Sequence, residues 1–133
     1  MDIQTPIDLA PLQRLGKDNL APVLQAFCDR WQIVELACFG SIVRDDFRPD
    51  SDIDLLVTWK PESRWTLLDF AQMQFDLEAL FDRPVDLVSK RAIEQSDNPL
   101  RRTAILDSAV PIYSQQIPIA IGKLYSISST PLT

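Results

Sequence analysis

Apolar residues recur at the three- and four-residue spacing of an amphipathic helix in two long stretches of the chain. The first stretch follows Asn19, a residue type that favours the N-cap of a helix. Pro22 falls in its first turn, where a missing N–H costs little. The pattern therefore predicts a helix across the apolar positions Leu20, Val23, Leu24, Phe27 and Trp31.

The second stretch predicts a longer helix over residues 64–81, with Ser63 as its cap. An apolar surface this wide is typical of a core helix, part of which a partner protein can also cover. Three further helical elements are expected: turns around residues 9–15 and 91–96, and a final helix that Asp97 caps and that ends near residue 109. The apolar positions of the long helix form two stripes, one of Leu67, Leu68, Ala71 and Phe75 and one of Phe70, Met73, Leu77 and Leu80.

Short apolar runs bounded by turn residues predict strands between and after these helices. Three strands are expected over residues 33–39, 52–59 and 84–88, and residues 110–113 form either a last strand or the end of the final helix. Helices that alternate with strands indicate α/β layering, in which helices cover one sheet. We expect one domain over residues 1–114 with its motifs in 20–113, and a tail over 115–133 that is poorly ordered or docks a partner.

The 133-residue chain is acidic, with a formal net charge of −6, and it contains no histidine. An acidic surface repels a phosphodiester backbone, so we expect no direct nucleic-acid binding. Cys28 and Cys38 lack metal-site spacing and are expected to be buried, reduced thiols. The sequence begins without a basic leader and contains no apolar run of about 18 residues. We therefore expect a cytoplasmic protein without a membrane segment.

The densest candidate chemistry lies between residues 39 and 56, in the sequence FGSIVRDDFRPDSDIDLL. Gly40-Ser41 follows a strand and opens a predicted short helix up to Asp46, where backbone N–H groups and a hydroxyl can hold an anion. Asp52 and Asp54 are two residues apart on a strand and so share one face. Adjacent carboxylates repel each other unless a cation lies between them, and Mg²⁺ prefers oxygen ligands together with substrate phosphates. The stretch therefore predicts a phosphate cradle beside a magnesium site.

Gly-Ser, ten residues, then Asp-x-Asp resembles the signature of the polymerase-beta-like nucleotidyltransferases. The segment GSIVRDDFRPDSDIDLLV is similar to the motif of the minimal nucleotidyltransferase branch of that superfamily. The resemblance implies a polymerase-beta-like fold, a small mixed β-sheet backed by helices. It also implies ATP as substrate and a two-metal Mg²⁺ site formed by Asp52, Asp54 and a third carboxylate from a neighbouring strand. Asp86 in PVDLV matches that third position, where it would hold the catalytic metal and orient or deprotonate the acceptor hydroxyl.

Arg44 lies one helical turn after Ser41, where the family usually carries arginine. It either contacts the triphosphate, together with Gly40 and Ser41, or pairs with a neighbouring aspartate of the same loop. Asp45 departs from the family pattern, which has glycine at this position, and its charge opposes nucleotide binding unless it faces away. The tryptophans, at positions 31, 59 and 65, fit core positions better than a base-stacking role.

Three functions remain open at this point. Minimal nucleotidyltransferases of this size resemble antitoxins that transfer AMP from ATP to a tyrosine of a HEPN-domain ribonuclease toxin. The alternatives are a small-molecule nucleotidyltransferase of the aminoglycoside-modifying kind and an antitoxin that acts by binding alone. The chain has little room for an acceptor pocket, which favours a protein partner that supplies the acceptor. Its expected docking surface combines the long helix and the tail, through Phe70, Met73, Leu77, Phe81 and Tyr125.

Overall fold

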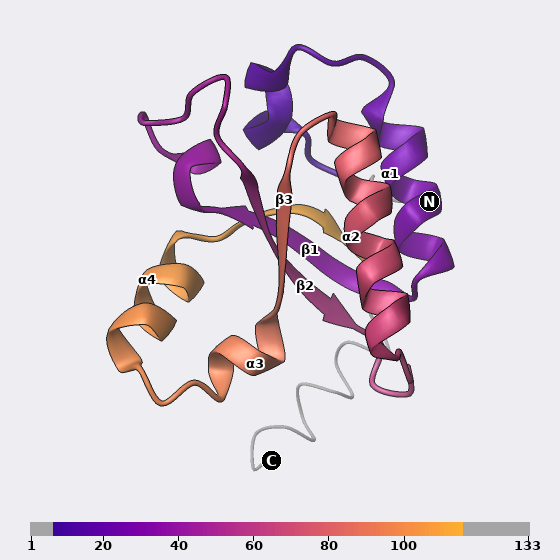
Figure 1. Ribbon diagram of the computed structural model, residues 1–133, viewed down its shortest axis with the longest axis vertical. Helices are drawn as coiled ribbons and strands as arrows, with labels where there is room; N and C mark the ends of the chain where they lie inside the picture. Colours follow the sequence, from indigo (N-terminus) through magenta and orange to yellow (C-terminus); the bar gives the residue numbers. More distant parts are fainter. Residues whose placement is uncertain (1–6, 116–133) are drawn as a thin grey trace, which may run out of the picture.

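A four-stranded sheet forms the centre of the protein and lies between two layers of helices (Figure 1). The computed structural model describes residues 7–115. None of the described helices is long and apolar enough to cross a membrane. In chain order the elements are η1 (Ala10–Leu15), α1 (Leu20–Arg30), β1 (Ile33–Phe39), η2 (Gly40–Val43), β2 (Ile53–Trp59), α2 (Leu67–Phe81), β3 (Val85–Ser89), α3 (Lys90–Glu94), α4 (Pro99–Ser108) and β4 (Val110–Ser114).

The sheet is mixed, with the strand order β3-β2-β1-β4. Strand β1 runs antiparallel to both of its neighbours, β2 and β4. Strands β2 and β3 are parallel and are connected by α2, because parallel neighbours need a long crossover. The small mixed sheet backed by helices is therefore confirmed, and the open choice for residues 110–113 is resolved as a strand.

The two faces of the sheet carry separate apolar clusters. The larger cluster packs β-strand side chains such as Leu55 and Val57 against α1, α2 and η1. The smaller cluster lies on the opposite face and packs Leu56 against Ile93 of α3 and Ile105 of α4. Because side chains alternate along β2, Asp54 lies on the same face as Leu56, on the side of α3 and α4.

Two of the three predicted helix caps are wrong, each for a local reason. Helix α2 begins at Leu67, because Thr66 and Asp69 form a reciprocal capping box, and the Ser63 hydroxyl instead donates to Gln32. Helix α4 is capped by the Asn98 side chain and not by Asp97. Asn19 occupies the cap position of α1, as predicted, but its φ of 60° is left-handed and its side chain makes no cap bond.

The predicted docking surface on α2 is largely wrong. Met73, Leu77 and Phe81 are fully buried in the larger cluster, where they face α1 and the sheet. The exposed apolar side chains of α2 belong instead to the other stripe, with Leu67 at 86%, Leu68 at 83% and Phe75 at 66% exposure. Tyr125 and the predicted tail beyond Gln115 lie outside the described residues.

The buried-thiol prediction is confirmed for both cysteines. Cys28 and Cys38 are buried and form no disulfide with each other. Burial raises the pKa of each thiol to about 12, with a smaller contribution from Asp29 beside Cys28 and from Asp54 beside Cys38. Both cysteines therefore behave as small apolar core residues.

Candidate active site

The chain turns sharply at Gly40, where β1 ends and η2 begins. Gly40 has a φ of 75°, in the left-handed region that favours glycine. A Cβ at this position would overlap Oδ2 of Asp54 and lie 3.1 Å from its Cγ. Glycine is therefore required both for the turn and for the close approach of the Asp54 carboxylate. The predicted short helix is a single 3-10 turn over Gly40–Val43, shorter than the expected stretch to Asp46.

Asp54 and Asp86 lie directly opposite each other on neighbouring strands. The parallel pairing of β2 and β3 matches Ile53 with Val85, Asp54 with Asp86 and Leu55 with Leu87. Residues in register on adjacent strands direct their side chains to the same face of the sheet. The expectation that Asp86 lies on the strand beside Asp54 and shares its face is therefore confirmed. Asp52 precedes Ile53, the first residue of β2, and is exposed.

Burial and neighbouring negative charges both shift the pKa of Asp54. Its pKa is raised above the ordinary value, first by partial burial and then by the charges of Asp86 and Asp52, while Arg44 acts in the opposite direction. Like charges this close make ionisation unfavourable. A cation placed between these carboxylates would remove that penalty, which is the electrostatic condition for a metal site.

Arg44 is engaged within its own loop. Its Nε and one terminal nitrogen donate to the two carboxylate oxygens of Asp46, each over 3.1 Å. This bidentate contact lowers the pKa of Asp46. Of the two alternatives from the sequence, the structure contains the ion pair between Arg44 and an aspartate of the same loop, Asp46. Arg44 must therefore leave Asp46 before it can contact a triphosphate with the same atoms.

The acidic side chains offer oxygen donors of the kind that Mg²⁺ binds, but they do not form a ready-made cluster. Among residues 7–115, no three acidic or cysteine side chains gather around one metal position. Carboxylates without a cation repel one another, so side chains that later share an ion are not expected to converge beforehand. The donor set and its shared face fit a divalent cation, and the metal-ligand roles of Asp52, Asp54 and Asp86 stay predictions.

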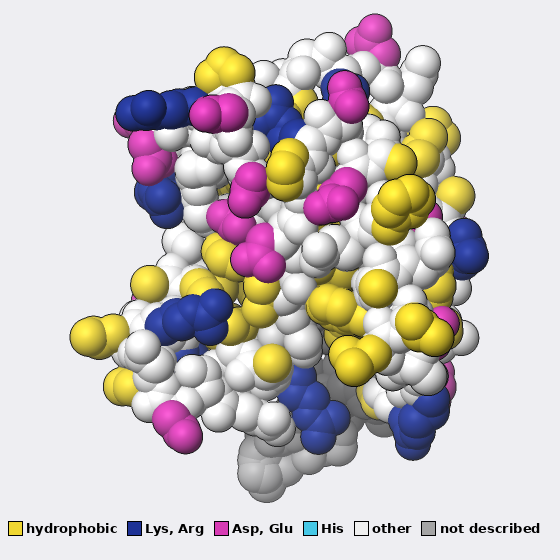
Figure 2. Space-filling view, viewed as in Figure 1, with side chains coloured by type: hydrophobic (Ala, Val, Ile, Leu, Met, Phe, Trp, Pro, Cys, Tyr) yellow, Lys and Arg dark blue, Asp and Glu magenta, His cyan; other side chains and the backbone are white. Residues whose placement is uncertain are grey.

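The surface above these strands is acidic and hollowed. Figure 2 shows acidic side chains grouped over the β2–β3 region of this face. They lie beside a recess between the loop that connects η2 with β2, at the upper left, and the α3–α4 layer. Asp52 and Asp86 are exposed, so this face of the sheet is open to solvent. A nucleotide and a second substrate can therefore approach it from outside.

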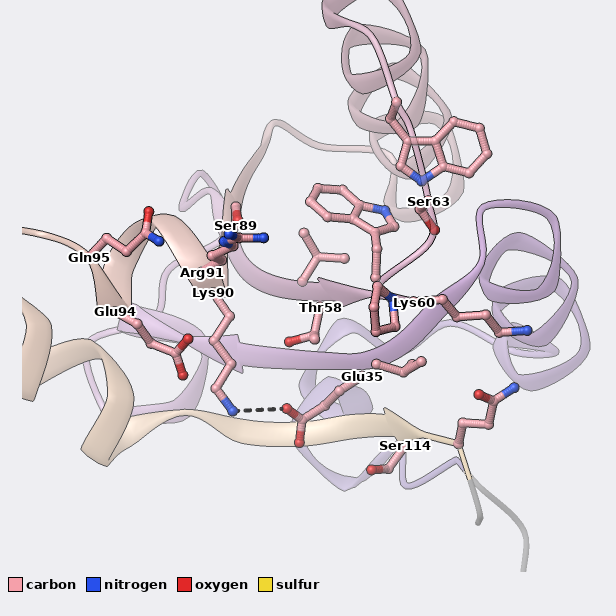
Figure 3. Close-up of a pocket in the computed structure, with 16 residues that line it drawn as sticks. Glu35, Thr58, Lys60, Ser63, Ser89, Lys90, Arg91, Glu94, Gln95 and Ser114 are labelled. Carbon is pink, nitrogen blue, oxygen red and sulfur yellow. Dashed lines mark hydrogen bonds and ion pairs between the residues drawn. The ribbon is translucent and has the colours of Figure 1, made fainter. Parts of the chain in front are cut away.

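The tryptophans lie away from the carboxylates. Trp59 and Trp65 line a cavity of about 810 Å³ at the opposite end of the strands, together with Glu35 and Lys90 (Figure 3). The Lys90 ammonium lies 3.3 Å from the Glu35 carboxylate across that cavity. Trp31 is buried and packs edge-on against Trp65, with ring centroids 5.1 Å apart. None of the three predicted ligand carboxylates lines this cavity.

The sequence analysis did not single out Arg14 and Arg83, which both contact the loop between Gly40 and Asp54. Their partners are backbone carbonyls 28 to 35 residues away. Side-chain contacts with distant carbonyls leave no local pattern. The position of Arg83, three residues before Asp86, is the one sequence signal that could have pointed to this region.

Comparisons with known proteins show the family to which the chain belongs. The profile of the nucleotidyltransferase domain family matches residues 20–112. The protein adenylyltransferase MntA of Thermococcus cleftensis is 39% identical over 66 residues, which cover 50% of this chain and 65% of the relative. The chain therefore spans slightly less than two thirds of that relative.

Solved structures give the same fold. A structure described as a minimal nucleotidyltransferase has a TM-score of 0.55 and 34% identity, and the match covers 81% of this chain and 99% of that one. A toxin–antitoxin structure with AMP-PNP has a TM-score of 0.56 over 86% of each chain. Its 16% identity supports the shared fold alone.

Proposed function

Because this chain belongs to the nucleotidyltransferase domain family, we propose that it is an antitoxin that transfers AMP from ATP to a tyrosine hydroxyl of a HEPN-domain ribonuclease. The observation that carries the proposal is the register of Asp54 with Asp86 beside Gly40. A relative with 39% identity is a protein adenylyltransferase of the MntA type. Adenylylation of the toxin would silence it.

In the proposed reaction the tyrosine oxygen attacks the α-phosphorus of ATP, the bond to the β-phosphate breaks and pyrophosphate leaves. Asp52, Asp54 and Asp86 would hold Mg²⁺, which when bound neutralises charge on the attacking and leaving oxygens. Asp86 is exposed at the open edge of the sheet, where it can accept the tyrosine proton. Gly40 lets the backbone approach the phosphates closely, and Ser41 donates its hydroxyl to them.

The described part of the chain provides a nucleotide side and leaves the acceptor to its partner. The recess beside the acidic side chains is open (Figure 2), and the cavity lined by Trp59 and Trp65 lies at the other end of the sheet. An acceptor supplied by a second protein has to be held in line with the α-phosphate, because most of the rate gain of such reactions comes from positioning.

Co-expression with a HEPN-domain protein tests this proposal. With the wild-type chain, we expect the intact mass of the partner to increase in AMP-sized steps, and the double variant Asp52→Asn/Asp54→Asn should abolish that increase. Asp45→Asn/Asp50→Asn is the matched control, because it removes two exposed charges from the same region but leaves the strand carboxylates in place. A partner that binds without a mass change would indicate neutralisation by contact. Transfer to an aminoglycoside and not to the partner would indicate a small-molecule enzyme.

A further inference from the structure

The loop over residues 44–52 joins the two halves of the proposed site. It connects the Gly40–Val43 turn with β2 and carries Asp52. Its own backbone bonds are few: Arg44 N–H donates to Ser41, and a turn closes where Ser51 N–H donates to the Arg48 carbonyl over 3.0 Å. A connection of this length without regular structure has low local stability unless side chains from elsewhere hold it.

Two arginines from distant parts of the chain supply that support. Arg14 of η1 donates to the carbonyl oxygens of Arg44, over 2.6 Å, and of Ile42, over 3.2 Å. Arg83 lies between α2 and β3 and donates to the Ser51 carbonyl over 3.1 Å. Arg14 therefore holds the end of the loop beside the Gly40 turn, and Arg83 holds the end beside Asp52.

The same two guanidinium groups contact one aromatic ring. The guanidinium carbon of Arg83 lies 4.9 Å from the centroid of the Phe47 ring, and that of Arg14 lies 5.5 Å from it. Both distances fall within the range of a cation–π contact. Phe47 is half-buried and also packs against the larger core cluster. Phe47 thus joins both arginines, the loop and the core in one arrangement.

Arg83 also links the loop to β3, the strand that carries Asp86. The Pro84 carbonyl accepts the Ile53 N–H over 3.0 Å, so the chain next to Arg83 is bonded to the residue between Asp52 and Asp54. A shift of Arg83 would therefore change the position of Asp52 relative to Asp86. Small displacements of this kind cost far more in rate than in stability.

From these contacts we infer that Arg14, Phe47 and Arg83 are positioning residues of the transfer site, which act by holding the 44–52 loop and contact no substrate themselves. The inference rests on the proposed function for its catalytic consequence, and on the loop contacts alone for its structural part. Its rival is a purely structural role, in which these residues add stability and nothing else.

Arg30 offers a matched control for that rival. Its guanidinium carbon lies 4.8 Å from the centroid of the Trp31 ring, and its guanidinium faces Asp76 of α2. Arg30 therefore lies on the α1–α2 side of the sheet, away from the loop. Arg83→Lys, Arg14→Lys and Arg30→Lys all keep the charge and lose the planar guanidinium. A difference between the first two variants and the third therefore reports the position of the arginine and not its chemistry.

The test measures amide hydrogen exchange without substrate, and kcat and KM for ATP with the HEPN-domain partner, all in the full chain. For Arg83→Lys and Arg14→Lys we expect exchange at the hydrogen-bonded amides of Arg44, Ser51 and Ile53 to rise about tenfold or more. We expect kcat to fall by about 10- to 100-fold, at an unchanged melting temperature relative to Arg30→Lys. KM should change less than kcat. Phe47→Leu should give the same pattern.

Exchange and kcat equal to those of Arg30→Lys would overturn the inference. The exchange measurement needs no activity, so it decides the loop-holding role even if the wild-type chain transfers no nucleotide. In that case the proposed function fails, and faster exchange confined to residues 44–54 would still support the anchoring, whereas uniform exchange would refute it.

Discussion

Replacing Gly40 with alanine should reduce transfer far more than it reduces stability. The new side chain meets two costs: a φ of 75°, which disfavours an L residue by about 1–2 kcal/mol, and overlap with Oδ2 of Asp54. The overlapping atom is at the end of a side chain that can rotate, and holding a side chain about 30° away from its rotamer costs about 0.5–1.5 kcal/mol. Gly40→Ala should therefore lower the free energy of unfolding by about 1.5–3.5 kcal/mol.

The functional effect follows from where the carboxylate goes. Asp54 can avoid the new methyl group only by rotating away from the Gly40 turn, and a misplacement of about 1 Å costs about 100-fold in rate. Denaturant unfolding gives the stability term, and AMP transfer to the partner protein gives the rate.

Gly16→Ala is the matched control, because Gly16 has a φ of 65° and no atom within 4 Å of its would-be Cβ. It should lose only the backbone term and keep full activity. In an Asp54→Ala background the overlap is absent, so Gly40→Ala should then cost the same as Gly16→Ala. Wild-type transfer by Gly40→Ala, or an equal cost with and without the Asp54 carboxylate, would refute the reasoning.

Three further expectations follow from the same region and the core. First, the pKa of Asp54 is raised in the folded state, so its protonated carboxyl stabilises the fold. That stabilisation is complete below the ordinary aspartate pKa of 3.8 and is lost as pH rises through the raised pKa. Without metal, Asp54→Asn should therefore be more stable than wild type at pH 7 and show no advantage at pH 3, as measured by denaturant unfolding; the opposite order would contradict the charge repulsion. Second, Mg²⁺ should raise the melting temperature of the wild type and not that of Asp52→Asn/Asp54→Asn, and equal shifts would remove the metal assignment. Third, thiol pKa values of about 12 predict that Cys28 and Cys38 react with a thiol reagent at pH 8 only after unfolding; rapid reaction in the native state would show that they are accessible.

The sequence alone was sufficient to locate the strands. Strand β1 was predicted with its observed bounds, and β2 and β3 to within one residue, because short apolar runs between turn residues have few alternatives. The pairing of Asp54 with Asp86 followed from the family resemblance. Nothing in the local sequence of either strand specifies its neighbour.

The errors lie where a residue's partner is distant or where several residues compete. Ser63 and Thr66 both qualify as caps, and Thr66 is used because Asp69 completes the capping box. The stripe of α2 that faces the core depends on how α1 packs, so Met73 is buried while Phe75 is exposed. The loop contacts of Arg14 and Arg83 span about 30 residues of sequence. Such choices are made by tertiary packing and cannot be inferred from a helical period alone.

The parallel pairing of β2 with β3 has a consequence for how the protein folds. Asp54 and Asp86 are adjacent in the sheet but are separated by α2 along the chain, so they meet only after that helix has formed the crossover. Closing such a long-range contact is slow compared with local structure, and here it also brings two carboxylates together. The two acids therefore oppose the step that assembles them, and a divalent cation that bridged them would speed the completion of the sheet as well as serve the chemistry.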